Sequence, residues 1–343
     1  MSQGLALDPL AGWILQQGLA GSASAITVQP LSGGQSNPTF RVSTDRGEYV
    51  LRKQPPGPLL ASAHAIDREY RVMAALADTP VPVPRMLAWC DDASLLGTPF
   101  YLMEFLAGRV LADQSLPGAQ PAERAALYGE MNRVLAALHA VDPAAVGLGD
   151  YGRSGNYVAR QVARWSRQCE ASTLALPPAM RRLMDWLPQH LPAHDATTVV
   201  HGDYRLDNLV FHAREPRVLG VLDWELSTLG DPLADFSYHC MSWRIPASLW
   251  RGIAGLDLRA LGIPDEASYV RRYEETSGRA TAPHWEFYMA YNLFRMAAIL
   301  HGIAQRAADG TAAAADAVET GRKAAPLAEL AWDCALRHQA ATR

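Results

Sequence analysis

The segment from His201 to Asn208, HGDYRLDN, gathers acidic, basic and amide side chains in one short stretch. It leaves the apolar run TTVV and enters the apolar run NLVF, so we expect its polar groups on a loop that buried strands hold at both ends. Fifteen residues after Asn208, the apolar run VLGVL leads to Asp223. A hairpin between these runs would return the Asp223 carboxylate to the Asn208 amide.

Carboxylate and amide oxygens are hard ligands that suit Mg²⁺, which keeps several waters and takes other ligands from phosphates. Asn208 and Asp223 are therefore predicted metal ligands in a nucleotide site. Asp203, five residues before Asn208, could accept the proton of an attacking hydroxyl, as an Asp does in phosphoryl transfer. A turn with local hydrogen bonds would explain HGD alone. It would not explain the full spacing HxDxxxxN, an apolar strand and a further Asp.

Length and composition limit the class of protein. With 343 residues the chain exceeds what one compact core usually organises, so two lobes or two domains are expected. The formal charge is −4 and no long run of Lys or Arg occurs, which argues against a nucleic-acid partner. Four widely spaced cysteines without metal-ligand spacing predict buried free thiols in a reducing cytoplasm. No segment reaches the ~18 uninterrupted apolar residues of a membrane span, so we expect no membrane partner.

The first hundred residues predict a small antiparallel sheet. Helical spacing over residues 8–20 predicts an opening helix, and a second helix is expected over 62–76. Five short β-rich runs are separated by turn signals or by the second helix, namely ITVQPL, TFRVST, EYVLRK, PVPVPRMLAWC and TPFYLMEFL. We therefore expect a five-stranded sheet with one main helix.

The rest of the chain is predicted to be mostly helical, with a single β island at residues 197–224. Helical patterns cover residues 121–140, 155–172, 178–190, 268–277, 284–308 and 312–339. The fold class is thus α+β and bilobal. Its predicted parts are an N-terminal lobe at 1–103, a hinge at 104–108, and a helical catalytic and substrate-binding lobe at 109–343 that contains the small β-hairpin.

HGDYRLDN followed by VLDWE resembles the catalytic signature of the aminoglycoside phosphotransferase and choline kinase superfamily, whose members are relatives of the protein kinases. The resemblance implies a protein-kinase-like fold and transfer of the γ-phosphoryl group of ATP, with Mg²⁺, to a small-molecule hydroxyl. It also implies Asp203 as catalytic base, Asn208 and Asp223 as Mg²⁺ ligands, and His201 as an organiser of the loop. Asp231 and Asp235 are expected to be structural, one capping a helix and one tying down the loop.

The same resemblance assigns nucleotide contacts in the first lobe. It implies that Ser36 in SGGQSNPTF meets the β-phosphate and that VLRK supplies the cation for the phosphates, with Arg52 favoured over Lys53. Glu69 is the helix acid that would pair with this cation. The backbone at Glu104 and Phe105 would bind adenine at the hinge.

Several sequence segments resemble one subgroup of this superfamily, the kinase module fused to acyl-CoA dehydrogenases. They are GGQSNPTF, SAHAIDREYRVM, AVDPAAVGLGDYG and DWELSTLGDPLADFSYHC. The resemblance implies phosphorylation of a hydroxyacyl-CoA, typically at the 4-hydroxyl. A protein substrate is not expected, because Gly202 stands where protein kinases carry Arg and no APE segment occurs.

Arginines at helical spacing support an anionic small-molecule acceptor. Arg160, Arg164 and Arg167 recur at i, i+4 and i+7, with Arg153 just before them and only Glu170 as a counter-charge. Such a face suits a CoA phosphate, although a solvated helix face would explain it equally.

Other functions stay open from the residues alone. The acceptor could be an aminoglycoside or another amino alcohol, or the chain could be a nucleotide-binding pseudokinase. A metallohydrolase that uses His201, Asp203, His212 and Asp223 is a further alternative.

Overall fold

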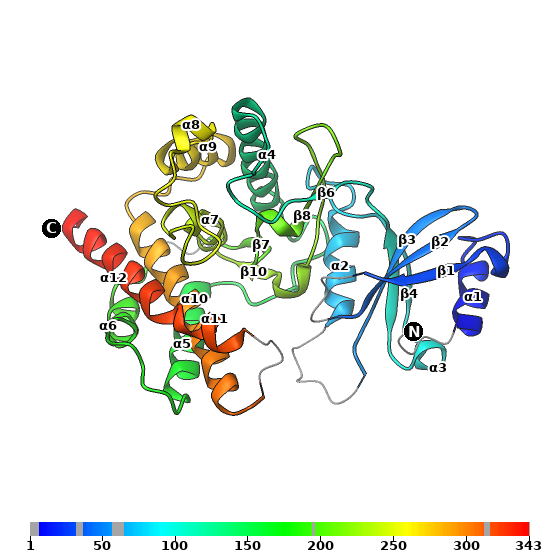
Figure 1. Ribbon diagram of the computed structural model, residues 1–343, viewed down its shortest axis with the longest axis horizontal. Coiled ribbons are helices and arrows are strands. Elements are labelled where there is room, and N and C mark those ends of the chain that lie inside the picture. The colour runs from blue at the N-terminus through cyan, green and yellow to red at the C-terminus, as the bar shows by residue number, and fades with distance from the viewer. Residues whose placement is uncertain (1–6, 32–36, 57–64, 194–195, 312–315, 343) are drawn as a thin grey trace. The chain divides into compact units, whose positions relative to one another are not determined.

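The chain folds into two compact units in a computed structural model that describes residues 7–31, 37–56, 65–193, 196–311 and 316–342 (Figure 1). The first unit comprises Met1–Val110 and Asn208–Ser227, and the second comprises Leu111–Asp207 and Thr228–Arg343. Residues 208–227 pack within the first unit, whereas the sequence prediction placed them in the C-terminal lobe.

The first unit is built on the predicted five-stranded antiparallel sheet, with strand order β1-β2-β3-β5-β4. The strands are β1 (Thr27–Pro30), β2 (Thr39–Thr44), β3 (Gly47–Lys53), β4 (Met86–Cys90) and β5 (Phe100–Glu104). The helices are α1 (Leu7–Gln16), α2 (Ile66–Leu76) and the short α3 (Ala93–Leu96). The α+β fold and this sheet are confirmed. The opening helix is shorter than predicted because Gly18, with φ 71°, follows its end.

Strand alternation explains how α1 is held on the sheet. Phe40 and Val42 of β2 are buried on the same face, as period-two geometry requires. Leu10 and Ile14 of α1, one turn apart, are fully buried in the same hydrophobic cluster. Trp13 adds an edge-to-face contact with Phe100, with ring centroids 4.9 Å apart.

A second, three-stranded sheet of the first unit carries the predicted hairpin. Its order is β6-β8-β9, from β6 (Arg109–Val110), β8 (Leu209–Phe211) and β9 (Val218–Val221). Leu209 pairs with Val221, so the hairpin is confirmed. The prediction of a single β island was wrong. The TTVV run forms β7 (Thr198–Val200), which pairs in the second unit with β10 (Thr228–Gly230), outside the predicted 197–224 island.

The second unit is mainly helical, as predicted. Its helices are α4 (Pro121–His139), α5 (Tyr157–Glu170), α6 (Pro178–Trp186), α7 (Pro232–Cys240), α8 (Leu258–Leu261), α9 (Glu266–Ser277), α10 (Trp285–Ala308), α11 (Ala317–Arg322) and α12 (Ala324–Ala341). The prediction of one helix over 312–339 was wrong in its described part, because α11 and α12 are separated at Lys323. The predicted helix over 178–190 ends at Trp186, ahead of Pro188 in a short 3₁₀ turn.

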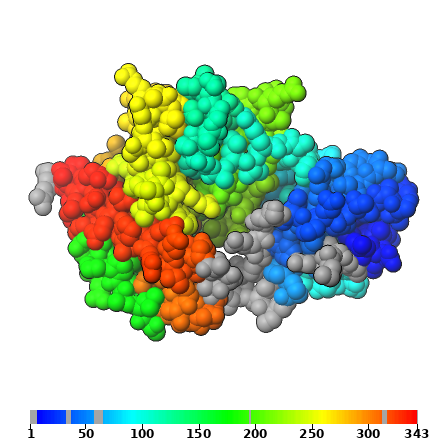
Figure 2. All heavy atoms as spheres, viewed as in Figure 1, coloured from blue at the N-terminus to red at the C-terminus, as the bar shows by residue number. Residues whose placement is uncertain are grey.

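Aromatic packing forms much of the core of the second unit. Phe236 of α7 stacks on Tyr273 of α9 with ring centroids 3.8 Å apart. On the surface, Figure 2 shows α9 in yellow beside α4 in teal, and the two helices are in contact. The four cysteines are buried and free, as predicted. Within the part of the chain that the structure describes, no helix is both long enough and apolar enough to cross a membrane.

Candidate active site

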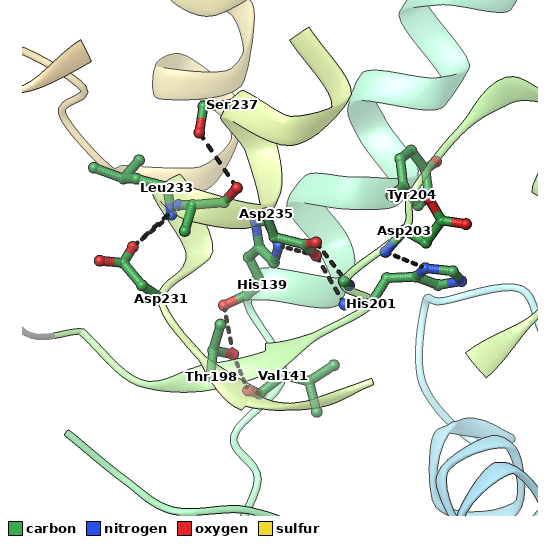
Figure 3. Close-up of polar contacts among 12 residues, drawn as sticks. His139, Val141, Thr198, His201, Asp203, Tyr204, Asp231, Leu233, Asp235 and Ser237 are labelled. Atoms are coloured by element: carbon green, nitrogen blue, oxygen red, sulfur yellow. Dashed lines mark hydrogen bonds and ion pairs between the residues drawn. The ribbon is translucent and has the colours of Figure 1, made fainter. Parts of the chain in front are cut away.

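One buried carboxylate anchors the backbone of the HGD loop in the second unit. Asp235 of α7 accepts hydrogen bonds from the N–H groups of His201 and Gly202, each at 2.8 Å (Figure 3). Burial favours the protonated acid, but the hydrogen bonds and charges of His139 and His201 together outweigh it and lower the pKa of Asp235 below its ordinary value. The prediction that one Asp ties down the loop is confirmed.

A second layer of polar groups fixes that anchor. His139 lies 2.7 Å through Nδ1 from the Tyr273 hydroxyl, and its carbonyl accepts from the Thr198 hydroxyl at 3.1 Å. Asp231 caps α7 by accepting from the N–H groups of Leu233 and Ala234, as Figure 3 shows for Leu233. Its predicted capping role is confirmed, and the loop is supported by groups that are themselves hydrogen-bonded.

The Asp203 carboxylate is held by two neighbours in the same unit. The Tyr238 hydroxyl donates to Asp203 Oδ1, and Arg205 Nε lies 2.9 Å from the same oxygen as an ion pair. Burial and the Asp203 charge raise the pKa of Tyr238, so its hydroxyl stays protonated and can donate. The Asp203 N–H donates to His201 Nδ1 at 3.2 Å, which gives His201 the predicted organising contact. Asp203 is thus a fixed carboxylate at the end of an anchored loop.

A buried arginine completes this side of the site. Arg295 of α10 donates through Nη2 to the Gly202 carbonyl at 2.8 Å, and its guanidinium carbon lies 4.9 Å from the Tyr238 ring centroid. Sequence reasoning missed Tyr238, Arg205 and Arg295. Arg205 lies inside the quoted motif, but Arg295 lies more than ninety residues away and carries no local signal.

In the first unit, a buried ion cluster forms around Arg52. Arg52 Nε lies 2.8 Å from Glu69 Oε2, and Nη2 lies 3.2 Å from Asp223 Oδ1. Glu69 is 1% exposed and also accepts from the Tyr101 hydroxyl at 3.0 Å and from the Asn37 amide at 2.9 Å. The acid therefore fixes the direction of the guanidinium, so the predicted pairing is present, and phosphate binding by Arg52 stays a prediction.

Lys53 takes no part in that cluster. Because successive side chains of a strand point to opposite faces, Lys53 lies on the other face of β3 from Arg52. Its ammonium donates to the Leu96 carbonyl at 2.8 Å. The structure thus favours Arg52 over Lys53 as the cation that belongs to the candidate site.

The hairpin brings the backbone of Asn208 close to that of Asp223 within the first unit, and metal binding by their side chains stays a prediction. The Leu222 N–H donates to the Asn208 carbonyl at 2.8 Å, which places Asp223 next to this pairing. Asp223 has φ 65° and ψ 57°, a left-handed conformation that is unusual for a residue other than glycine and is enriched at functional sites. Its side chain is 36% exposed. An accessible carboxylate is a ligand that suits a Mg²⁺ ion, which completes its shell with phosphates and water.

The metallohydrolase alternative gains no support. No group of three or more His, Cys, Asp or Glu side chains among the described residues is placed to hold a metal ion. His201 Nδ1 already accepts the Asp203 N–H, and His212 Nδ1 accepts the N–H groups of Arg214 and Glu215.

The predicted adenine contacts lie at a segment whose amides are already used. The Glu104 N–H donates to the Arg85 carbonyl at 2.9 Å, and the Phe105 N–H donates to the Glu48 carbonyl at 3.4 Å. Adenine binding here stays a prediction and would require the remaining polar groups of the segment. Ser36 lies outside the described residues.

The predicted arginine face lies on α5 in the second unit, but its members differ. Arg160 is half-buried and donates to the carbonyls of Gly155 and Arg153 just before the helix, so it has a local structural role. Arg164 and Arg167 are exposed, and Arg164 lies 5.2 Å from the Trp165 ring centroid. Acceptor binding by these residues stays a prediction.

We expect the second unit to lose stability in mild acid because of His239. This residue is 4% exposed, lies 2.8 Å through Nε2 from the Tyr269 hydroxyl, and has its pKa lowered to about 4 by burial. Since the ordinary pKa is about 6.5, the neutral side chain stabilises the fold above that pH, and this contribution is lost as pH falls from about 6.5 towards 4.

From this change alone, the free energy of unfolding should fall by about 2 kcal/mol between pH 7 and pH 5. Urea unfolding of wild type and His239→Gln at both pH values measures it. If the free energy of unfolding changes equally with pH in the two proteins, His239 is not the source of the acid sensitivity.

The site and the fold define a class of enzyme, and comparison with known proteins agrees. A family model described as "Phosphotransferase enzyme family" matches residues 27–291. The chain therefore belongs to the phosphotransferase enzyme family and is a kinase that acts on a hydroxyl group.

Similar proteins come from bacteria and from animals. A crystal structure from Ralstonia eutropha, provisionally named an aminoglycoside phosphotransferase, is 55% identical, covers 96% of this chain and 98% of its own, and has a TM-score of 0.89. The mouse protein "Acyl-CoA dehydrogenase family member 10" is 48% identical over 325 residues, which are 94% of this chain and 30% of that protein. Rat "Acyl-CoA dehydrogenase family member 11" is 42% identical over 322 residues, 92% of this chain and 41% of that protein.

The chain thus spans 30% and 41% of the length of these two animal relatives. A more distant structure, a mutant aminoglycoside phosphotransferase in ternary complex with AMP-PNP and hygromycin B, is 14% identical, with a TM-score of 0.62 over 94% of this chain and 98% of its own. It confirms the protein-kinase-like fold.

Proposed function

We propose that the chain is an ATP- and Mg²⁺-dependent kinase that phosphorylates the hydroxyl of a hydroxyacyl-CoA. The main support for this chemistry is the fixed position of the Asp203 carboxylate. Asp235 anchors the loop that carries it, and Tyr238 and Arg205 contact the carboxylate itself. A fixed carboxylate can accept the hydroxyl proton as the oxygen attacks the γ-phosphorus. The bond from that phosphorus to the leaving ADP oxygen breaks in the same transfer.

The nucleotide part of the proposal rests on the first unit. Arg52, aimed by Glu69, would contact the phosphates, and Asn208 and Asp223 would hold Mg²⁺. When bound, Mg²⁺ would neutralise charge on the phosphate oxygens. Structures of relatives are described with AMP-PNP and with GDP, which supports binding of a purine nucleotide here.

The proposed acceptor is supported by exposed positive charge on α5 and by the names of similar proteins. Arg164 and Arg167 are exposed on α5, where an anionic CoA could meet them, and a polycationic aminoglycoside would be repelled. Two animal relatives that align with more than 90% of this chain are named acyl-CoA dehydrogenase family members. An acyl-CoA dehydrogenase acts on acyl-CoA compounds, and a kinase for hydroxyacyl-CoA would act on the same class of compound. An amino alcohol is the second candidate, because the Ralstonia relative is named for aminoglycosides.

Asp223→Ala is expected to raise the Mg²⁺ concentration required for half-maximal activity at least tenfold, since one of only two proposed protein ligands is lost. A Mg²⁺ titration at saturating ATP measures it. The matched control is Asp257→Ala, which removes the exposed cap of α8 and should leave the titration unchanged. An equal Mg²⁺ requirement in wild type and Asp223→Ala would remove Asp223 from the metal site.

A screen of ATP consumption tests the function as a whole. The acceptors are short hydroxyacyl-CoAs, amino sugars and choline-like alcohols, each with ATP and Mg²⁺. We expect turnover with a hydroxyacyl-CoA and little with the cationic alcohols. Turnover confined to an amino sugar or to choline would replace the proposed acceptor, and nucleotide binding without turnover of any acceptor would favour a pseudokinase.

A further inference from the structure

Arg295 is a buried cation that forms no direct salt bridge with a described residue. It is 7% exposed, and its one hydrogen bond in the described part of the chain runs from Nη2 to the Gly202 carbonyl. Its Nε has no hydrogen-bond partner there, and the Asp203 carboxylate acts on the guanidinium electrostatically without a direct ion pair. Buried charges are normally paired, because removing one from water is costly. An oxygen-rich ligand would supply the missing interaction.

Two further buried donors without partners lie near Arg295 in the same unit. Trp165 Nε1 of α5 and the Tyr291 hydroxyl of α10 make no hydrogen bond with any described residue. The guanidinium carbon of Arg295 is 6.0 Å from the Trp165 ring centroid, and Tyr291 lies one helical turn before Arg295. A buried donor that is left unsatisfied costs about 1–3 kcal/mol, and a ligand oxygen that bound these donors would remove that cost.

These three donors lie in the same unit as the proposed catalytic base, and Arg295 lies near that base. Arg295 lies against the ring of Tyr238, and the Tyr238 hydroxyl donates to Asp203. Arg295 also donates a hydrogen bond to the carbonyl of Gly202, the residue before Asp203. Burial raises the pKa of Tyr291, which keeps its hydroxyl protonated. An indole N–H, a guanidinium and a protonated phenol all donate hydrogen bonds. They match a carbonyl or carboxylate oxygen, whereas the charge of the guanidinium would repel an ammonium group.

We propose that Trp165, Tyr291 and Arg295 form an acceptor subsite that binds the acyl carbonyl oxygen of the substrate, as thioester or carboxylate, while its hydroxyl faces Asp203. This inference rests on the proposed function and names the group that the kinase recognises. Arg164, which also lies against Trp165, stands beside the subsite on the exposed surface of α5 and suits the anionic remainder of the acceptor.

Two conservative substitutions test the subsite. Trp165→Phe and Tyr291→Phe each delete one donor and keep an aromatic ring, so the KM for a short hydroxyacyl-CoA should rise about 10-fold in each variant while the KM for ATP stays unchanged. Tyr128→Phe is the matched control, because it deletes a buried phenol that donates to the Gln114 carbonyl on another part of the unit. Its acceptor KM should equal that of wild type.

Thermal unfolding without ligand separates binding from a structural role. Tyr291→Phe removes an unpaired donor and keeps the ring, so its Tm should equal or exceed that of wild type, whereas Tyr128→Phe loses a hydrogen bond and should have a lower Tm. If Tyr291→Phe loses as much Tm as Tyr128→Phe, the Tyr291 hydroxyl has a structural partner and the subsite is wrong.

Calorimetric binding of a free 4-hydroxy acid and of the matching diol, without nucleotide, makes the test independent of turnover. We expect wild type to bind the acid, to bind the diol much less, and to lose affinity for the acid in both variants. Trp165-dependent binding of the acid without phosphorylation of any acyl-CoA would support the subsite and overturn the proposed function.

Phosphorylation of an acyl-CoA with an unchanged acceptor KM in both variants would support the proposed function and overturn the subsite. A rise in the KM for ATP alone would assign the donors to the nucleotide phosphates and overturn the subsite. Failure of wild type both to bind the acid and to phosphorylate acyl-CoA would overturn both proposals.

Discussion

Asp203→Asn should lower kcat by at least about 10²-fold, since a positioned general base contributes roughly 10²- to 10⁴-fold. The amide has the same shape and can still accept from the Tyr238 hydroxyl, so the anchored loop should keep its structure. It cannot take the proton of the attacking hydroxyl. The KM for ATP should barely change, because the proposed nucleotide groups belong to Arg52 and the hairpin.

Steady-state kinetics at saturating ATP measures this effect. Asp265→Asn makes the same chemical change at the exposed cap of α9 and should retain wild-type kcat. Circular dichroism and Tm show whether either variant is misfolded. If Asp203→Asn is folded and its kcat lies within a few-fold of wild type, Asp203 is not the base.

Arg52→Met should destabilise the first unit by about 3–5 kcal/mol, the cost of leaving a buried charge without its partner. Glu69 is 1% exposed and would keep only its uncharged donors, Tyr101 and Asn37. Burial raises the pKa of Glu69 and Arg52 opposes that rise. In the variant Glu69 should therefore take up a proton on folding, so its stability deficit relative to wild type should be smaller at pH 5 than at pH 8.

The double variant Arg52→Met, Glu69→Gln removes both charges and should recover a large part of the lost stability. Because the proposed phosphate contact stays absent, its affinity for ATP should remain low. Urea unfolding and ATP binding of the two variants separate the structural role of the pair from its nucleotide role. A double variant that is no more stable than Arg52→Met would contradict the buried-pair explanation.

Much of the first unit could be predicted because its signals are local. The run TFRVST alternates buried and less buried side chains and forms β2 over the predicted residues. The VLGVL run returns beside NLVF because turn residues separate two short apolar strands. The pairing of β7 with β10 was missed, since TLG is only three residues long and has no periodicity that can be measured.

The candidate site divides in the same way. Asp203, Asn208 and Asp223 were proposed from a spacing that lies within one short stretch of the chain, and their roles stay predictions. Tyr238 and Arg295 reach Asp203 and Gly202 only through the packing of α7 and α10, which no motif encodes. The stripe at Arg160, Arg164 and Arg167 was visible, but helical spacing could not show that Arg160 donates to carbonyls ahead of its own helix.

The most direct test of the central claim is to incubate the wild-type chain with ATP, Mg²⁺ and a short 4-hydroxyacyl-CoA and to identify the product by mass spectrometry and ³¹P NMR. We predict an acyl-CoA that carries one added phosphoryl group on its hydroxyl oxygen, formed in equal amount with ADP. An aminoglycoside in the same assay should remain unmodified. An unmodified acyl-CoA together with a phosphorylated aminoglycoside would contradict the account.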